Sequence, residues 1–352
     1  MGRTSALRGL DVEVALRAAI AVVVPLTVLV IIGRLDWAAY GAFGGMAAIF
    51  GRRERYRMRV RTVPAAAGGI LVSVTAGTVL AAAAAPLWAE AAVLVGVIVL
   101  GILLIAVLRM APPTPLFFVF GLLVCASVPT APSEVLPRLL VAVLSAAFAI
   151  AVSLSGWSLR RALGPRGAAA FTPLSPIAPL RPEALRDRTV WLNIAQNVVA
   201  AVAAGAVAAG LGIGHPYWAV VGAVAVVPPP GAAHSLARAW HRVIGTLGGI
   251  VVAGLILWPS PPVAVLVIVV GVAQFAAEVL VGRHYGAALL AITPLALVVS
   301  YLSHPVALDG LLADRVVETL LGCLAGVVVV LLARSIGPRW IAGRQAQSAA
   351  PR

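Results

Sequence analysis

The sequence predicts an all-α membrane protein, a polytopic helical bundle of about twelve transmembrane helices in two pseudo-repeats of six. Three observations lead to this prediction. Hydrophobic residues make up 62% of the chain, charged residues make up 11%, and the mean hydropathy is +1.05. A soluble protein of this composition could not cover its surface with polar groups. Several apolar segments reach the roughly 17–25 residues that a helix needs to cross a bilayer, and part of the first half recurs in the second.

Apolar segments follow one another along the whole chain, separated by short polar turns. Their alanine, leucine and valine content favours helices over the alternating pattern of a membrane barrel. The predicted spans are 15–33, 38–51, 63–84, 91–108, 114–130, 138–157, 190–212, 216–230, 243–258, 262–281, 285–303 and 316–334. Those at 38–51 and 216–230 are short, so the sequence leaves open whether they cross the membrane or are tilted, broken or re-entrant.

The spans divide the chain into two halves joined by a linker. Residues 1–157 form the first predicted transmembrane repeat, and residues 190–334 form the second. Between them, residues 158–189 are rich in proline and arginine, which predicts a cytoplasmic linker. Residues 335–352 are short and polar, which predicts a cytoplasmic tail.

The charged residues indicate how the chain is oriented in the membrane. There are 26 basic residues, all of them arginine, against 12 acidic ones, which gives a net charge of +14. Most arginines lie in short loops on one side of the predicted spans, as the positive-inside rule requires. The loops on the other side hold Arg34, Arg138 and Arg315 alone. We therefore expect both termini in the cytoplasm, and membrane topology rather than a nucleic-acid partner as the reason for the charge.

One stretch of the first half recurs in the second half at an offset of 181 residues. DWAAYGAFGGMAAIFG, which contains Trp37, aligns with YWAVVGAVAVVPPPG, which contains Trp218. In both copies a basic turn and a small-residue helix come next. Repetition of hydrophobic helices is a common way to build transporters, with the pathway between the halves. The repeat therefore predicts a transport path between two pseudo-repeats.

The basic turn of each copy carries two arginines four residues apart. These are Arg57 and Arg61 in the first copy, and Arg238 and Arg242 in the second. In a helix this spacing places both guanidinium groups on one face, and the planar guanidinium suits a carboxylate. Two such pairs could form a cationic vestibule for an organic anion. Positive-inside topology alone would also place arginines here.

Trp218 and two glycine pairs are further candidates. Trp218 lies at the end of a predicted span, where an aromatic belt is expected and where its ring could also stack on an aromatic ligand. Glycines four residues apart allow neighbouring helices to approach closely. The pairs are Gly245 with Gly249 and Gly322 with Gly326.

Polar residues also occur within otherwise apolar spans, where they usually face a partner or a water-filled cavity. Arg17 and Asn197 occupy nearly corresponding positions in the two halves. A local ion pair between Glu13 and Arg17 is the alternative. Gln274 and Glu278 lie four residues apart in the tenth span. Glu278 could carry a proton and couple transport to a proton gradient, or it could pair with an arginine at the membrane edge.

Nothing in the sequence points to enzymatic chemistry. It contains no P-loop, no G-x-S-x-G and no H-E-x-x-H motif. The two cysteines, Cys125 and Cys323, lie in apolar spans and suggest neither a disulfide framework nor a metal site. We therefore expect a non-enzymatic protein without a catalytic site, a metal or a cofactor.

The second copy of the repeat resembles the signature region of the fusaric acid resistance-like (FUSC) integral membrane transporters, over the stretch HPYWAVVGAVAVVPPPGAAHSLARAWHRVIGTLGGIVVAG. A later segment is similar to a late helix of that domain, namely DRVVETLLGCLAGVVVVLL. The residues that match the pattern are Trp218, Arg238, Arg242, Gly245, Thr246 and Gly249. The first copy departs from it, since Pro64 and Ala65 stand where the second has Gly245 and Thr246. The resemblance implies a bacterial inner-membrane transporter related to aromatic carboxylic acid exporters.

These observations predict an exporter of small organic anions, aromatic carboxylates among them, driven by the proton gradient. The substrate-binding candidates are Arg57, Arg61, Arg238, Arg242, Trp218 and Thr246. The expected partners are the lipid bilayer and the anion, and a homo-oligomer is left open. Two alternatives remain: a passive anion channel, and a non-transporting scaffold whose arginine loops bind anionic lipid or a partner protein.

Overall fold

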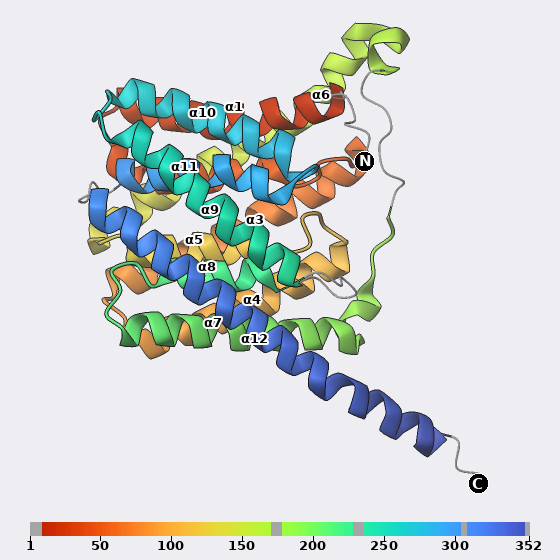
Figure 1. Ribbon diagram of the computed structural model, residues 1–352. Coiled ribbons are helices and arrows are strands. Elements are labelled where there is room, and N and C mark those ends of the chain that lie inside the picture. Colours follow the sequence, from red (N-terminus) through yellow and green to blue (C-terminus); the bar gives the residue numbers. More distant parts are fainter. Residues whose placement is uncertain (1–8, 170–177, 228–234, 304–307, 349–352) are drawn as a thin grey trace.

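The computed structural model describes residues 9–169, 178–227, 235–303 and 308–348, and within these ranges the chain forms twelve α-helices (Figure 1). The first six are α1 (Gly9–Ile31), α2 (Ala38–Gly45), α3 (Tyr56–Ala82), α4 (Leu87–Leu108), α5 (Leu116–Ser127) and α6 (Val135–Ala169). The other six are α7 (Arg188–Gly210), α8 (Tyr217–Val226), α9 (Ser235–Leu257), α10 (Val263–Val281), α11 (Tyr285–Ser303) and α12 (Leu308–Ser348). The prediction of an all-α membrane bundle is confirmed.

Nine of the described helices are long and apolar enough to cross a membrane. The other three, α2, α5 and α8, have 8, 12 and 10 residues. At 1.5 Å per residue, a ten-residue helix covers about 15 Å, half of a hydrocarbon core of about 30 Å. The prediction of about twelve spans is therefore too high, because the segments 38–51, 114–130 and 216–230 hold short helices. The proline run at 228–230 lies outside the described residues.

Helices α2 and α8 lie inside the bundle. All eight residues of α2 are buried, and so are nine of the ten residues of α8. Neither helix contains a charged residue, and both carry alanine, glycine and other apolar side chains on every side. A helix that is apolar all round is stable only where other protein elements surround it. Composition thus accounts for their central position.

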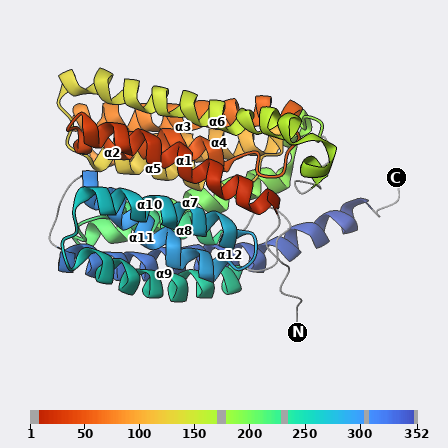
Figure 2. The same cartoon turned by 90° about the horizontal axis from the view of Figure 1, so that it is seen from above.

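The two halves of the chain form two groups of helices. Figure 2 shows α1–α6 on one side of the molecule and α7–α12 on the other. Helix α1 packs along α10, and α4 packs along α7, so these two contacts join the halves. Between them, α2 meets α11 and α5 meets α8. The short helices therefore lie at the boundary between the halves, where the longer helices leave room for a cavity.

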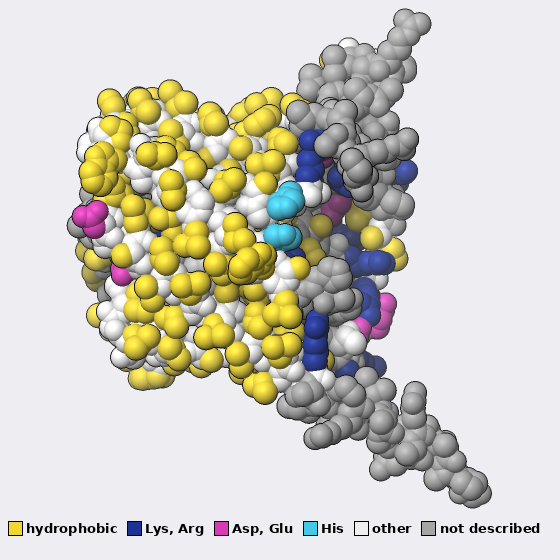
Figure 3. All heavy atoms as spheres, in the orientation of Figure 1, with side chains coloured by type: hydrophobic (Ala, Val, Ile, Leu, Met, Phe, Trp, Pro, Cys, Tyr) yellow, Lys and Arg dark blue, Asp and Glu magenta, His cyan; other side chains and the backbone are white. Residues whose placement is uncertain are grey.

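Arginines gather at one end of the bundle. Figure 3 shows hydrophobic side chains over the broad middle of the molecule and arginines along one edge. At this edge, Asp11 of α1 lies 3.8 Å from Arg52 and 3.7 Å from Arg283, measured between carboxylate oxygen and guanidinium nitrogen. We call this edge the arginine-rich end. The opposite edge, called here the far end, holds the ion pair between Arg34 and Glu134 at 2.8 Å.

Helices α6 and α12 extend beyond the predicted ends of the two repeats. Helix α6 continues past residue 157 to Ala169, and Gly164 interrupts it with a φ of 66°, a conformation that glycine adopts at little cost. Helix α12 continues past residue 334 to Ser348. Parts of the predicted linker and of the predicted tail are thus helical.

Candidate functional site

A cavity of about 420 Å³ lies at the boundary between the two halves. It is lined by residues of α2, α5, α8, α9, α10, α11 and α12. The lining includes Arg52 and Arg238 at the arginine-rich end and Ser303 at the other end of α11. Small-molecule sites have volumes of about 300–1,000 Å³, so the cavity is large enough for a small ligand.

Aromatic rings form one wall of the cavity. Phe120 of α5 has its ring centroid 5.1 Å from that of Phe43 of α2 and 4.8 Å from that of Trp218 of α8. Each of the three short helices thus contributes a ring. The indole Nε1 of Trp218 is buried and has no hydrogen-bond partner among the described residues. The wall offers a ligand an apolar surface with one free N–H donor.

Two arginines of the second half lie beside Trp218. The guanidinium carbon of Arg315, on α12, is 3.7 Å from the centroid of the Trp218 ring. Arg242, on α9, donates a hydrogen bond from Nη1 to the hydroxyl of Tyr285 at 3.3 Å. Arg242 is 4% exposed and Arg315 is 2% exposed, yet both line the cavity. The cavity therefore has a buried cationic region next to its aromatic wall.

Some N–H donors of these two guanidinium groups have no hydrogen-bond acceptor among the described residues. Nε of Arg242, and Nε and Nη1 of Arg315, are buried without a hydrogen-bond partner among the described residues. A buried donor without an acceptor costs about 1–3 kcal/mol, and more when it is charged. A carboxylate placed here would accept charge-assisted hydrogen bonds from them. The arrangement can thus bind an organic anion, with its carboxylate at the arginines and its apolar body on the rings.

Gln274 and Glu278, both on α10, also line the cavity. Glu278 accepts a hydrogen bond from Nη1 of Arg52 at 3.0 Å, and Arg52 donates another to the backbone carbonyl of Glu278. Gln274 is 2% exposed, and its Oε1 has no hydrogen-bond partner among the described residues. Since Arg52 belongs to the first half and Glu278 to the second, this ion pair links the halves beside the cavity.

The predicted arginines of the first half do not line the cavity. Arg57 is exposed, and Arg61 donates a hydrogen bond to the carbonyl of Ala178 at 3.3 Å. The fully buried arginine of this turn is Arg59, whose Nη1 lies 3.1 Å from a carboxylate oxygen of Glu13. The face of helix α3 that carries Arg59 thus points toward the interior of the bundle. Of the two predicted arginine pairs, the structure brings only the second-half pair to the cavity.

Neither Arg17 nor Asn197 is among the residues that line the cavity. Arg17 donates hydrogen bonds to the carbonyls of Ala48 and Phe50, at 3.2 Å and 3.4 Å. Asn197 donates from Nδ2 to the carbonyl of Asn193, one turn earlier in α7, at 2.9 Å. These donors bind backbone carbonyls of the protein itself, which favours a structural role over ligand binding.

The two glycine pairs lie where helices cross closely. Gly245 and Gly249 of α9 face α11, and Gly322 and Gly326 of α12 face α8. A Cβ added to Gly245 would lie 2.4 Å from the carbonyl oxygen of Gly286. Thr246, beside this crossing, is fully buried and is not among the residues that line the cavity. The glycines therefore allow close packing of α9, which carries Arg242, against α11, and of α12, which carries Arg315, against α8.

Two residues of this site, Arg52 and Arg315, have no sequence motif that marks them as ligand-binding residues. The sequence predicts a loop position for Arg315, and this prediction is wrong: the residue lies in α12. The sequence feature that indicates a helical position for Arg315 is the long apolar run that follows it directly, in DRVVETLLG. Arg52 has no local signal that distinguishes it from the other arginines of its turn, because only the contact with α10 selects it.

Comparison with known proteins agrees with this description. Residues 200–329 match the family described as fusaric acid resistance protein-like. The chain is also 31% identical, over 144 residues, to the uncharacterized membrane protein YvaC of Bacillus subtilis (strain 168), a match that covers 41% of this chain and 22% of that relative. No solved structure matches the chain. The matched region contains Trp218, Arg242 and Arg315, so the second half of this chain is similar to the fusaric acid resistance protein-like family over the residues that form one side of the cavity.

Proposed function

We propose that the protein transports small organic anions through the cavity between its halves. The observation that carries this proposal is the pair of buried arginines, Arg242 and Arg315, whose spare N–H donors lie beside an aromatic wall. Buried guanidinium donors without a protein acceptor favour the binding of an anion that can accept their hydrogen bonds. Aromatic carboxylates fit this chemistry best, because they combine a carboxylate for the arginines with a ring for Phe120 and Trp218.

Two repeats of six helices are part of the proposal. Corresponding helices pack in corresponding pairs: α2 on α6 and α8 on α12, then α3 on α5 and α9 on α11. Each repeated tryptophan also carries an arginine on its ring, Arg34 on Trp37 at 3.5 Å and Arg315 on Trp218 at 3.7 Å. Such repeats can rock against each other around a central site, which gives alternating access from the two sides of the membrane.

The arginine-rich end is proposed to face the cytoplasm of a bacterium, with the protein in the plasma membrane. Its support is the positive-inside rule, since this end carries most of the arginines. The cavity is lined by Arg52 and Arg238 of this end, so cytoplasmic anions are attracted to its mouth. Movement out of the cell follows as the proposed direction.

The ion pair between Arg52 and Glu278 is the proposed site of proton coupling. As long as Glu278 is ionised, the pair holds the two halves together at this end. Protonation removes the negative charge and with it the attraction for Arg52, which weakens the link between the halves at this end. Uptake of one proton would thus be linked to one switch of the cavity between the two sides of the membrane.

Flux measurements test the proposed function directly. The purified protein is reconstituted in liposomes, and uptake of radiolabelled benzoate is followed with and without an imposed pH gradient. We expect saturable uptake that the gradient accelerates. Ion-like unitary currents in bilayer recordings would favour a channel, and absence of flux across a panel of organic anions would contradict transport altogether.

Replacing Glu278 by glutamine is expected to remove the response to the pH gradient while leaving benzoate exchange without a gradient intact. Glutamine keeps the shape of the side chain but cannot take up a proton. The matched control is Glu183→Gln, at an exposed position that does not line the cavity. A gradient response of wild-type size in Glu278→Gln would exclude this carboxylate as the coupling group.

A further inference from the structure

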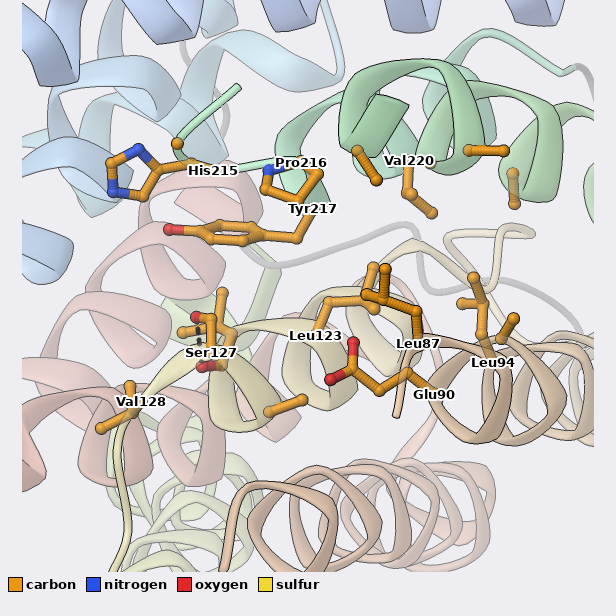
Figure 4. A pocket seen from close by; sticks show the side chains of 18 of the residues that line it. Leu87, Glu90, Leu94, Leu123, Ser127, Val128, His215, Pro216, Tyr217 and Val220 are labelled. Atoms are coloured by element: carbon orange, nitrogen blue, oxygen red, sulfur yellow. Dashed lines mark hydrogen bonds between the residues drawn. The ribbon is translucent and has the colours of Figure 1, made fainter. Parts of the chain in front are cut away.

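A second hollow, a groove of about 930 Å³, lies at the same boundary between the halves. Residues of α4 and α5 line one side, and residues of α7, α8 and the turn before α8 line the other. Figure 4 shows Leu87, Glu90 and Leu123 on one side of the groove, across from Tyr217 and Val220. The groove contains no part of the arginine-rich end, so it is distinct from the anion cavity.

The groove forms because α4 and α7 diverge. In one half of their length they pack together, with Ile98 and Ile105 of α4 in the same buried cluster as Val190 and Ile194 of α7. In the other half, residues of the first two turns of α4 and of the segment 201–210 of α7 line the groove from its two sides. The gap between two membrane-spanning helices opens on the flank of the bundle, which faces lipid.

Exposed apolar side chains at this opening support a lipid-facing position. Leu87 is 65% exposed, Trp88 is 74% exposed and Val202 is 37% exposed, and all three line the groove. Apolar side chains exposed to this degree are stable against hydrocarbon or at the interface with lipid headgroups. The opening therefore suits a molecule with an apolar body.

The groove and the anion cavity are separated by a single layer of side chains. Val124 of α5 and Ser300 and Ser303 of α11 line both hollows. Tyr217 lines the groove, and the next residue, Trp218, lines the cavity. A small movement of α5 against α11 would connect the two spaces.

The two hollows have opposite charge. The cavity is lined by four arginines, Arg52, Arg238, Arg242 and Arg315, and by one carboxylate, Glu278, so its lining carries a net positive charge. Among the residues that line the groove, Glu90 is the only aspartate, glutamate, lysine or arginine. An anion that moved from the cavity into the groove would leave a lining of net positive charge and meet a carboxylate, so it would be released rather than held.

We propose that the groove is the release route of the transporter, through which amphipathic organic anions leave sideways into the far half of the bilayer. The anion passes the layer formed by Val124, Ser300 and Ser303, and then emerges between α4 and α7. Its apolar body stays in contact with apolar walls along the way. This inference rests on the proposed function, and it adds that the substrates are lipophilic carboxylates rather than small hydrophilic anions.

Filling the groove tests the route. We expect the double variant Ala91→Trp/Ala206→Trp, with one new ring on each side of the groove, to lower benzoate flux by about tenfold or more while the Kd for benzoate, measured by calorimetry on the purified protein, stays unchanged. The control is Ala92→Trp/Val207→Trp, one residue along each helix, at exposed positions that do not line the groove. It should match the unaltered protein in both measurements.

Flux at the unaltered rate in the groove variant, with benzoate still bound, would overturn the route and leave the proposed function standing. An unaltered protein that neither binds nor transports benzoate would overturn both. If gel filtration shows that the tryptophan pair does not fold, Glu90→Arg replaces it, with Glu90→Gln as its control. The arginine gives the anion a second partner in the groove, so we expect lower flux at saturating benzoate, and unchanged flux would overturn the route.

Discussion

Replacement of Arg315 by alanine is expected to weaken benzoate binding by about thirtyfold, the equivalent of about 2 kcal/mol for lost hydrogen bonds to a charged partner. Arg315 is 2% exposed, it stacks on Trp218, and two of its nitrogens have no protein acceptor among the described residues. Alanine removes both the charge and the donors. Calorimetric titration of the detergent-purified protein with benzoate measures the change in Kd.

Two further variants separate anion binding from general effects of charge. Arg57→Ala removes an exposed arginine that does not line the cavity, so its Kd should equal that of the unaltered protein. Arg315→Lys keeps the charge but loses the planar fork that grips a carboxylate, so we expect intermediate affinity. A wild-type Kd in Arg315→Ala would exclude this residue from the site.

Replacement of Gly322 by alanine is expected to destabilise the second half of the bundle by about 1–3 kcal/mol, the usual cost of overpacking. A Cβ at this position would lie 2.2 Å from the carbonyl oxygen of Ala219 and 2.9 Å from the Cα of Gly222. Both atoms belong to the backbone of α8, so rotation of a side chain cannot relieve the contact. Thermal unfolding of the purified protein, followed by circular dichroism, measures the loss.

The matched control on the same helix is Gly310→Ala. Among the described residues, no atom lies within 4 Å of a Cβ added to Gly310, and alanine favours a helix by about 1 kcal/mol over glycine. The same substitution should therefore have opposite effects at the two positions. Equal unfolding temperatures for Gly322→Ala and the unaltered protein would show that α8 and α12 do not pack as closely as described.

The helix order could be predicted from sequence because hydropathy is a local property. A run of apolar residues must be a helix in the bilayer, since hydrocarbon supplies no hydrogen-bond partner for the backbone. Helix length was harder to predict, and α5 shows why. Its predicted span, 114–130, is mostly apolar, but the helix covers Leu116–Ser127 alone. Neighbouring protein can surround a short helix and the irregular backbone beside it, so composition does not decide length there.

Only part of the candidate site could be predicted from the sequence. The arginines show which part could not. Spacing of four residues places Arg238 and Arg242 on one helix face, and both line the cavity. The same spacing in Arg57 and Arg61 has no such outcome, because α3 presents Arg59 to the interior instead. Periodicity states which residues share a face, whereas packing against other helices decides which face turns inward.

The sequence by itself determined that this chain is an all-helical membrane protein with its arginines gathered at one end, since both properties follow from the transfer of each segment between water and lipid. Tertiary structure alone decided which polar groups meet. Arg52 reaches Glu278, and Arg315 reaches Trp218, across separations of 226 and 97 residues. Such contacts depend on the summed packing of several helices, so no segment contains the information that creates them.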